Sequence, residues 1–122
     1  MTKVLIVEDN LSIVKVTRIL LEREGFLVEA CADERCFELA RTWAPSIILM
    51  DVRLPGLDGI EACLTLKKDE LTKHIPVIMV SADGDIEELA VEACADGILS
   101  KPFSNKSLIG IIRAHAADGA VN

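Results

Sequence analysis

Three acidic residues stand at the ends of two short apolar runs. Residues 3–7 lead directly into Glu8 and Asp9, and residues 46–50 lead directly into Asp51. Runs this short and this apolar are typical of strands buried on both faces, as in parallel sheets. An acid at the carboxyl end of such a strand faces the crevice where open α/β sheets bind ligands. Carboxylates gathered there repel one another unless a cation lies among them, so the pattern predicts a hard-cation site.

Two further strand ends add a hydroxyl and an ammonium group to this crevice. Ser81 and Ala82 follow the apolar residues 76–80, and Lys101 follows residues 97–100. This inventory suits phosphoryl transfer to a carboxylate. One Asp attacks phosphorus, while Mg²⁺, a Lys and a hydroxyl neutralise the phosphoryl oxygens.

Strand and helix patterns alternate along the whole chain. We expect strands at Lys3–Glu8, Phe26–Cys31, Ser46–Met50, Pro76–Val80 and Gly97–Ser100. Helical periodicity lies between them, as at Ile60–Lys68 and Ile86–Cys94, and Ser104 can cap a last helix. Such alternation predicts an α/β fold with a doubly wound parallel sheet and helices on both faces. A dinucleotide fold is disfavoured, because the first turn is Glu8-Asp9-Asn10 and would repel a pyrophosphate.

Composition limits the classes of function. The 122 residues predict a single domain over 1–122, and the net charge of -7 argues against direct nucleic-acid binding. No apolar stretch is long enough to span a bilayer and no signal peptide is visible, so we expect no membrane insertion and a cytoplasmic location. The four cysteines, Cys31, Cys36, Cys63 and Cys94, lie in apolar patterns and are expected to be buried reduced thiols. Residues 116–122 are expected to fray.

At this point the chain closely resembles the receiver domain of bacterial two-component response regulators, of the stand-alone, CheY-like type. The matching segments run in order through residues 4–10, 48–59, 76–82, 95–97 and 101–103. The resemblance covers essentially the whole chain. It implies a flavodoxin-like (CheY-like) five-stranded sheet with strand order 2-1-3-4-5.

The resemblance also implies a role for each site residue. Asp51 would accept a phosphoryl group from a phosphohistidine of a partner. Mg²⁺ would be held by the Asp9 and Asp51 side chains, by the backbone carbonyl of Arg53, and through water by Glu8. Lys101 would pair with Asp51 at rest and with the phosphoryl group afterwards, and the Lys101-Pro102 bond would be cis.

Two small residues complete the implied site. Ser81 would hydrogen-bond a phosphoryl oxygen, and Ala82 is small enough to leave room for the group. The implied partners are a sensor histidine kinase or histidine phosphotransfer protein and a downstream protein target.

The chain departs from the family pattern in the segment that, in the family, usually responds to phosphorylation. Where the family often has Tyr or Phe, three residues before the conserved Lys, this sequence has Ile98. The stretch between Ser81 and Lys101 also looks short. We therefore expect signalling through repositioning of the loop and helix after Asp83, without an aromatic flip. Arg53 and Asp83 flank the site at positions that tune dephosphorylation in the family.

The expected function is a phosphorylation-activated signalling switch, which catalyses only its own phosphorylation and dephosphorylation. The alternative is a receiver domain excised from a larger response regulator or hybrid histidine kinase. A metal-dependent phosphatase would need a D-x-D motif, and Asp51-Val52-Arg53 does not supply one. A receiver-like protein that binds partners but accepts no phosphoryl group is disfavoured, because the acids, Ser81 and Lys101 are all present.

Overall fold

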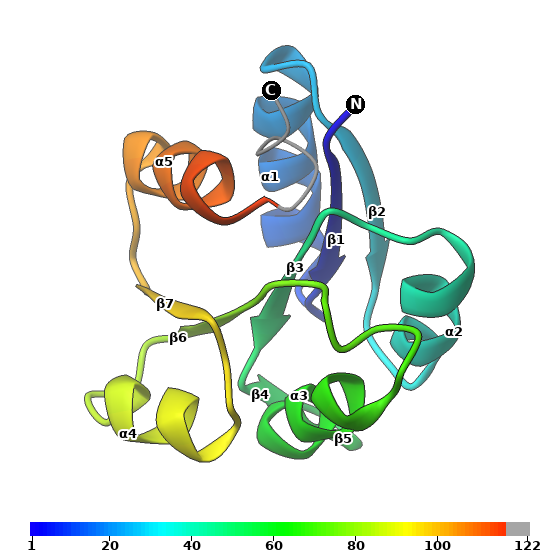
Figure 1. The fold of residues 1–122 in the computed structure, drawn as a ribbon. Helices are drawn as coiled ribbons and strands as arrows, with labels where there is room; N and C mark the ends of the chain where they lie inside the picture. Colours follow the sequence, from blue (N-terminus) through cyan, green and yellow to red (C-terminus); the bar gives the residue numbers. More distant parts are fainter. Residues whose placement is uncertain (117–122) are drawn as a thin grey trace.

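A five-stranded parallel sheet forms the centre of the molecule. The computed structural model describes residues 1–116. The sheet order is β2-β1-β3-β6-β7, with every pair parallel. Its strands are β1 (Lys3–Val7), β2 (Leu27–Cys31), β3 (Ile47–Asp51), β6 (Val77–Ser81) and β7 (Gly97–Ser100). Numbered without the short strands β4 and β5, this is the order 2-1-3-4-5, so the predicted fold class is confirmed (Figure 1).

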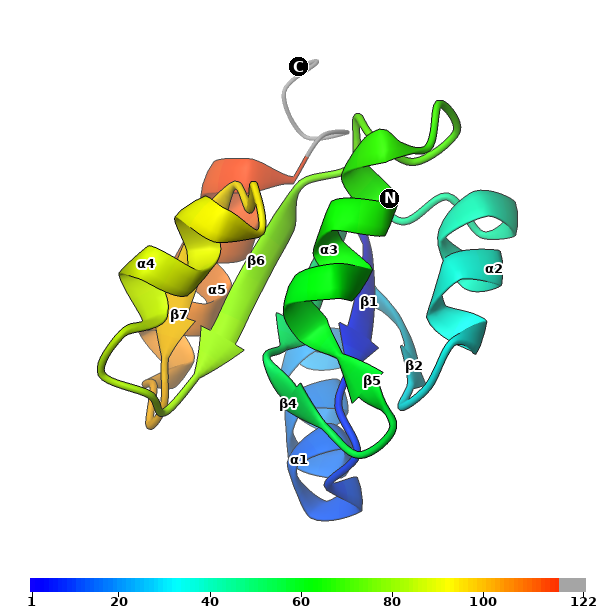
Figure 2. The same cartoon turned by 90° about the horizontal axis from the view of Figure 1, so that it is seen from below.

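Helices cover both faces of the sheet (Figure 2). Helices α1 (Leu11–Arg23) and α5 (Asn105–His115) lie on one face. The other face carries α2 (Arg35–Thr42), α3 (Gly59–Lys68) and α4 (Ile86–Glu92). Alternate residues of each strand point to opposite faces. Val4 and Ile6 therefore join the core under α1 and α5, whereas Leu5 and Val7 join the core under the other three helices.

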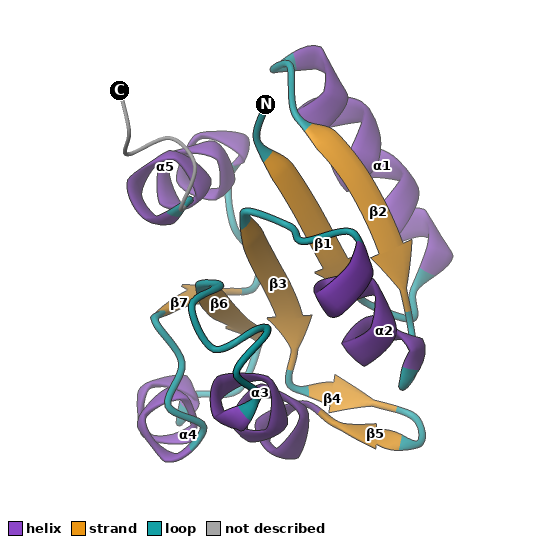
Figure 3. Ribbon diagram, turned by 45° about the vertical axis from the view of Figure 1, so that its right-hand side comes forward, coloured by secondary structure: helices purple, strands orange, loops and turns teal. Residues whose placement is uncertain are grey.

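A short hairpin was not predicted. No strand is among those expected between Met50 and Ile60, but β4 (Arg53–Leu54) pairs antiparallel with β5 (Leu57–Asp58). Its turn contains Gly56 at φ 75°, a backbone conformation that favours glycine. Figure 3 shows the hairpin projecting from the end of β3, the strand whose last residue is Asp51.

Three of the four cysteines are buried. Cys31, Cys36 and Cys63 are buried as expected, but the prediction is wrong for Cys94, which is exposed. Helix α4 ends at Glu92, and Cys94 adopts a left-handed φ of 60° that takes it off the buried helix face. Within residues 1–116, no helix is long and apolar enough to cross a membrane. The expectation for 117–122 lies outside the described residues.

Candidate functional site

The first two acids are held where strand β1 passes into helix α1. The backbone N–H of Glu8 still donates to Cys31 O at 3.0 Å, which continues the strand pairing. Asn10 then caps the helix, because its Oδ1 accepts hydrogen bonds from the N–H groups of Ser12 and Ile13 at 3.0 and 3.2 Å. Glu8 and Asp9 are therefore fixed in the sharp turn between a buried strand and a capped helix.

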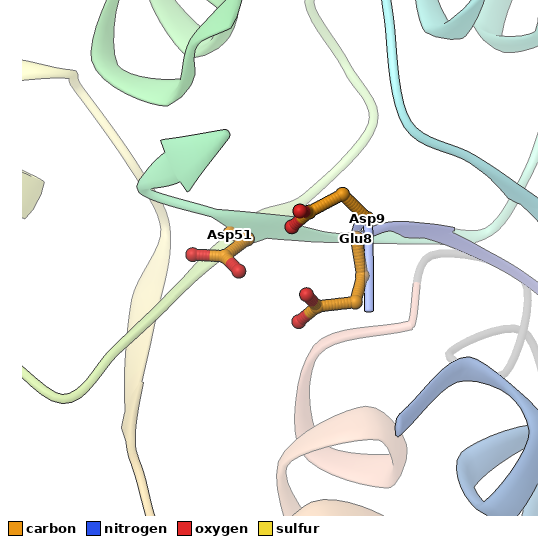
Figure 4. Close-up of side chains that lie close together, drawn as sticks. All are labelled: Glu8, Asp9 and Asp51. Carbon is orange, nitrogen blue, oxygen red and sulfur yellow. The ribbon is translucent and has the colours of Figure 1, made fainter. Parts of the chain in front are cut away.

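The three predicted acids meet at the carboxyl edge of the sheet. Glu8, Asp9 and Asp51 each offer a carboxylate oxygen within 4.8 Å of those of the others, and Figure 4 shows the Glu8 and Asp9 side chains pointing toward the side of Asp51. Glu8 and Asp51 are 7% and 8% exposed, while Asp9 is exposed. A cluster of carboxylate oxygens is the donor set that hard divalent cations prefer. The residues present therefore fit a metal of this kind.

Lys101 binds both buried acids. Its Nζ lies 3.1 Å from Glu8 Oε1 and 3.3 Å from Asp51 Oδ2. The expected pairing with Asp51 is confirmed, but the ammonium is shared with Glu8, which was not predicted. The backbone N–H groups of Asn10 and Arg53 donate to the other oxygens, Glu8 Oε2 at 3.1 Å and Asp51 Oδ1 at 3.0 Å. Every oxygen of the two buried carboxylates thus has a hydrogen-bond donor.

Burial disfavours the charged forms of Glu8 and Lys101, whereas the ion pair between them favours those forms. Burial raises the pKa of Glu8, and the neighbouring Asp51 charge adds to this, against the lowering effect of the Asn10 N–H and Lys101. Burial alone would lower the pKa of Lys101, but the pairs with Glu8 and Asp51 outweigh it and the pKa is raised. Lys101 therefore remains charged at neutral pH and offsets part of the repulsion within the acid cluster.

Ser81 and Ala82 lie at the same edge of the sheet, and within residues 1–116 neither is hydrogen-bonded to the three clustered acids. Ser81 is buried and pairs with Ser100 across the sheet, and its Oγ accepts the N–H of Asp83 at 3.0 Å. Its backbone carbonyl accepts the Lys101 N–H at 2.8 Å, which ties the ends of β6 and β7 together. Ala82 is exposed and lines an apolar groove with Lys101. The expected cis bond between Lys101 and Pro102 is confirmed.

An ion pair spans the space between two loops beside Asp51. Arg53 Nε lies 2.7 Å from Asp83 Oδ2, so the hairpin end of β3 is joined to the loop after β6. Asp58 acts as a helix cap, because its Oδ1 accepts the N–H groups of Ile60 and Glu61 at 2.9 and 3.4 Å. The Arg53 side chain therefore points to Asp83, and its contact with Asp51 is through the backbone.

Three hollows surround the acid cluster. An apolar groove of about 570 Å³ runs between α1 and α5 and includes Val16, Ala82 and Phe103. A more polar cleft of about 560 Å³ lies between Asp9 and the β4–β5 hairpin. Between them, a small cavity of about 20 Å³ lies under Glu8, Asp51 and Lys101. Lys101 lines both the apolar groove and the small cavity, whereas Asp51 lines the small cavity and Asp9 lines the polar cleft.

Sequence reasoning did not identify two residues at this site. Thr17 is not among the site residues predicted from the sequence, yet it lines both the groove and the small cavity. Phe103 was noted only as part of a motif, and it lines the same two hollows. The available signal for Thr17 was a polar residue at a buried helix position, which is uncommon without a partner.

Known proteins resemble this chain over nearly its whole length. The family model for the response regulator receiver domain matches residues 4–113. The transcriptional regulatory protein CseB of Streptomyces coelicolor is 45% identical over 116 residues, 93% of this chain, and the chain spans about half (48%) of that protein. The polar-differentiation response regulator DivK of Brucella abortus is 39% identical over 123 residues, which cover 97% of this chain and 99% of DivK.

A solved structure agrees with these matches. The receiver domain of a sensor histidine kinase from Pseudomonas aeruginosa, solved with a magnesium ion coordinated in its active-site cleft, is 31% identical. It superposes with a TM-score of 0.85 and covers 93% of this chain and 96% of that one. By fold, by family match and by relatives of this similarity, the chain belongs to the response regulator receiver domains of two-component signalling.

Proposed function

We propose that this receiver domain, spanning residues 1–122, is switched by phosphorylation of Asp51. The observation that carries the proposal is the position of Lys101 Nζ, 3.3 Å from Asp51 Oδ2, beside three acids whose oxygens lie within 4.8 Å of one another. A nucleophilic carboxylate next to a fixed ammonium is suited to accept a phosphoryl group, because the ammonium neutralises charge on the transferring oxygens.

The donor in this proposal is a phosphohistidine of a sensor kinase or histidine phosphotransfer protein. An Asp51 oxygen attacks phosphorus, a P–O bond forms and the P–N bond to the imidazole breaks. The bonding electrons stay on the imidazole nitrogen, which takes up a proton and leaves neutral. Lys101 moves its contact to a phosphoryl oxygen. Ser81 Oγ gives up the Asp83 N–H that it accepts at rest, and the Ser81 hydroxyl donates a hydrogen bond to another phosphoryl oxygen. Ala82 leaves room for the group.

Magnesium is the proposed cofactor. Asp9, Asp51 and the Arg53 carbonyl would hold it directly and Glu8 would hold it through water, and the ion would supply positive charge to the phosphoryl oxygens. The clustering of the three carboxylates supports this assignment. The magnesium ion in the related Pseudomonas receiver lends further support.

The output is proposed to be a contact with a downstream protein in the cytoplasm, without direct contact to nucleic acid. Ile98 is partly buried against the core under α4, so an aromatic flip is unavailable at this position. We expect phosphorylation to break the Ser81–Asp83 hydrogen bond and move the loop and the short helix α4. NMR shifts that stay flat from Ala82 to Cys94 on phosphorylation would contradict this mode of readout.

Labelling with a small phosphodonor tests the central assignment. Incubation with acetyl phosphate and Mg²⁺ should add one phosphoryl group, labile to alkali and hydroxylamine, as seen by intact mass. Asp51→Asn should abolish the addition, whereas Asp85→Asn, at an exposed position on α4's N-terminal side, should leave it unchanged. If the Asp51→Asn variant accepts phosphoryl as readily as the wild type, the proposal fails.

The second candidate is a receiver domain that forms one part of a longer protein. The chain spans about half of CseB at 45% identity, which favours a receiver that is one part of a longer transcriptional regulator. The match to nearly all of DivK favours the stand-alone form. The length of the native gene product, measured by intact mass from its own cells, distinguishes the two.

A further inference from the structure

The apolar groove between α1 and α5 lies along a helix that exposes apolar side chains. Both helices cover the same face of the sheet (Figure 2). Val16 and Leu20 of α1 line the groove together with Phe103 and Leu108, around a volume of about 570 Å³. Val16 is 68% exposed, and Ile19, one helical turn further, is 45% exposed. Exposed apolar residues that adjoin a groove, instead of lying scattered singly, are typical of an interaction surface.

The two ends of the groove have different surroundings. Toward the carboxyl ends of the helices, α1 and α5 are joined by an ion pair, with Arg113 Nη2 2.9 Å from Glu24 Oε1. The same guanidinium lies 5.9 Å from the centroid of the Phe26 ring. At the other end, Ala82 and Lys101 line the groove. The groove therefore begins at the carboxyl edge of the sheet and runs along α1 toward this ion pair.

The two helices beside the groove are positively charged, unlike the chain as a whole. Together α1 and α5 carry five basic residues and one acidic residue, whereas the chain has 13 basic and 20 acidic residues. Lys15, Arg23 and Lys106 are exposed, and within residues 1–116 none of them forms an ion pair. Lys106 precedes Arg113 by seven residues, so it lies on the side of α5 that faces α1. Unpaired cations thus flank the apolar groove on both helices.

We propose that the groove between α1 and α5 binds an amphipathic helix of a partner protein, whose apolar stripe is flanked by acidic residues. Apolar side chains at positions i, i+3 or i+4, and i+7 of that helix enter the groove over Val16. Acidic side chains beside the stripe pair with Lys15 and Lys106. The lining runs from Ser12 to Leu20, about 12 Å along α1, which matches two turns of a helix. The inference goes beyond the phosphorylation switch, because it needs no phosphoryl group on Asp51.

Other occupants fit the groove less well. A nucleic acid would pair with the cations but would bury no apolar side chain, and the net charge of -7 repels it. A second copy of the chain would have to offer an acidic helix with an apolar stripe. Helix α4 is acidic, but Val91 is the one large apolar residue that it exposes within the described part of the chain. These comparisons favour a partner of different sequence.

Two synthetic peptides test the proposal on the intact, unphosphorylated chain. Both carry the same leucine stripe at helical spacing, flanked by glutamates in one peptide and by lysines in the other. We expect the glutamate peptide to bind and to shift the NMR signals of Val16, Ile19 and Lys106. Its affinity should fall as salt rises, because exposed charges are screened. The lysine peptide should bind about tenfold or more weakly, since it meets cations with cations.

Matched variants locate the binding surface. Val16→Glu and Val91→Glu each place a carboxylate at an exposed valine of a helix, so both proteins should fold. We expect Val16→Glu to weaken the glutamate peptide about tenfold or more and Val91→Glu to leave its affinity unchanged. Lys106→Glu should weaken it about two- to fivefold, as for an exposed ion pair. Lys68→Glu, at an exposed position of α3, is the control for this charge reversal.

The outcomes separate this inference from its alternatives and from the proposed function. Equal affinities of the two peptides, no binding of the glutamate peptide, or shifts confined to α4 would each overturn it. A short DNA duplex that binds as tightly as the glutamate peptide would assign the cations to nucleic acid instead. Sedimentation that shows a dimer broken by Val16→Glu would assign the groove to a second copy. Failure of Asp51 to take label from acetyl phosphate would overturn the proposed function and leave the peptide result standing.

Discussion

Lys101 lies slightly closer to Glu8 than to the acceptor Asp51, at 3.1 Å against 3.3 Å. The resting ammonium is therefore divided between two carboxylates of which only one is the proposed nucleophile. Glu8 is one methylene longer than an aspartate, and its Oε1 meets the tip of the Lys101 side chain, which follows β7. Under the proposed function, transfer of a phosphoryl group to Asp51 would have to free Lys101 from Glu8 as well as from Asp51.

Replacing Glu8 by glutamine tests the role of this shared contact. Glu8→Gln keeps the shape and removes one negative charge, so Lys101 should pair with Asp51 alone. We expect the affinity for Mg²⁺ to fall about tenfold, as for other groups that hold a metal through water. Isothermal titration measures it, and Glu24→Gln, which removes only an exposed ion pair with Arg113, is the control. Unchanged Mg²⁺ affinity in Glu8→Gln would remove Glu8 from the proposed metal site.

Removal of the metal should lower stability, because the three carboxylates of the cluster then repel one another without a cation between them. Mg²⁺ bound at the proposed site should raise the melting temperature, by an amount that keeps growing as the Mg²⁺ concentration rises above the dissociation constant. Asp9→Asn should remove most of that increase, because Asp9 offers a ligand oxygen to the cluster. Without metal, the variant should be at least as stable as the wild type, since one repelling charge is gone.

Calorimetry with Mg²⁺ and with chelator measures both effects. Glu92→Gln, which removes an exposed acid from the end of α4, is the control and should respond to Mg²⁺ as the wild type does. An Asp9→Asn variant that gains as much from Mg²⁺ as the wild type would contradict the assignment.

Gly59 is required by the close approach of α3 to the acceptor strand. A Cβ at this position would lie 2.8 Å from Val52 Cα and closer still to the Asp51 carbonyl. Gly59→Ala should therefore lower the free energy of unfolding by about 2 kcal/mol or more and displace Asp51. In α5, Gly110 has nothing within 4 Å of the corresponding point, so Gly110→Ala should stabilise by about 0.5–1 kcal/mol. Urea denaturation measures the free energy of unfolding of both variants. Equal changes for Gly59→Ala and Gly110→Ala would contradict the structure.

The Arg53–Asp83 ion pair should slow hydrolysis of the phosphorylated protein. The pair joins the loops on either side of Asp51, and its Arg side chain is 75% exposed, so its contribution to stability is small. Breaking the bridge should open a path for water, so Arg53→Gln and Asp83→Asn should each shorten the lifetime of phospho-Asp51. Because both remove the same contact, the double variant should decay no faster than either single one.

The decay is followed by loss of the phosphoryl group after the donor is removed. Additive effects of the two substitutions, or a longer lifetime in both, would show that the two side chains act separately rather than as a bridge.

The fold was predictable because its strands and helices have different hydrophobic periods. Runs such as Leu5–Val7 carry no polar residue and must lie inside the sheet. Boundaries were less exact. The first strand was expected to include Glu8 but ends at Val7. The third and fourth strands were expected to end at Met50 and Val80, but each continues one residue further, to Asp51 and Ser81. The β4–β5 hairpin was missed because two-residue strands have no period to detect.

The composition of the site was predictable, and its internal contacts were not. Parallel strands bring their carboxyl ends to one edge, which is enough to gather Glu8, Asp51 and Lys101. Which carboxylate binds the ammonium depends on side-chain length and rotamer, so the Glu8–Lys101 pair appeared only in the structure. Cys94 was assigned to the core because its helix was expected to continue, and the actual end of α4 at Glu92 exposes it.

The cysteines give a prediction for stability at high pH. Burial raises the pKa of Cys36 and Cys63 to about 12 from an ordinary value of 9.0. Below pH 9 these thiols are neutral in both states, and their contribution to stability is complete. As the pH rises from 9 to about 12, the unfolded chain loses these protons and the folded chain keeps them, so stability should fall. The slope should reach about 1.4 kcal/mol per pH unit for each thiol.

Cysteine variants separate the contribution of Cys36 and Cys63 to this slope from the contributions of other titrating groups. Urea denaturation between pH 8 and pH 11 gives the free energy of unfolding of the wild type, of Cys36→Ala with Cys63→Ala, and of Cys94→Ala, at intervals of about one pH unit. The double variant will be less stable at every pH, because each replacement leaves a cavity, but its free energy should decline less steeply. Cys94→Ala should keep the wild-type slope, because Cys94 is exposed. Parallel curves for all three proteins would mean that the buried thiols ionise in the folded state as easily as in the unfolded chain.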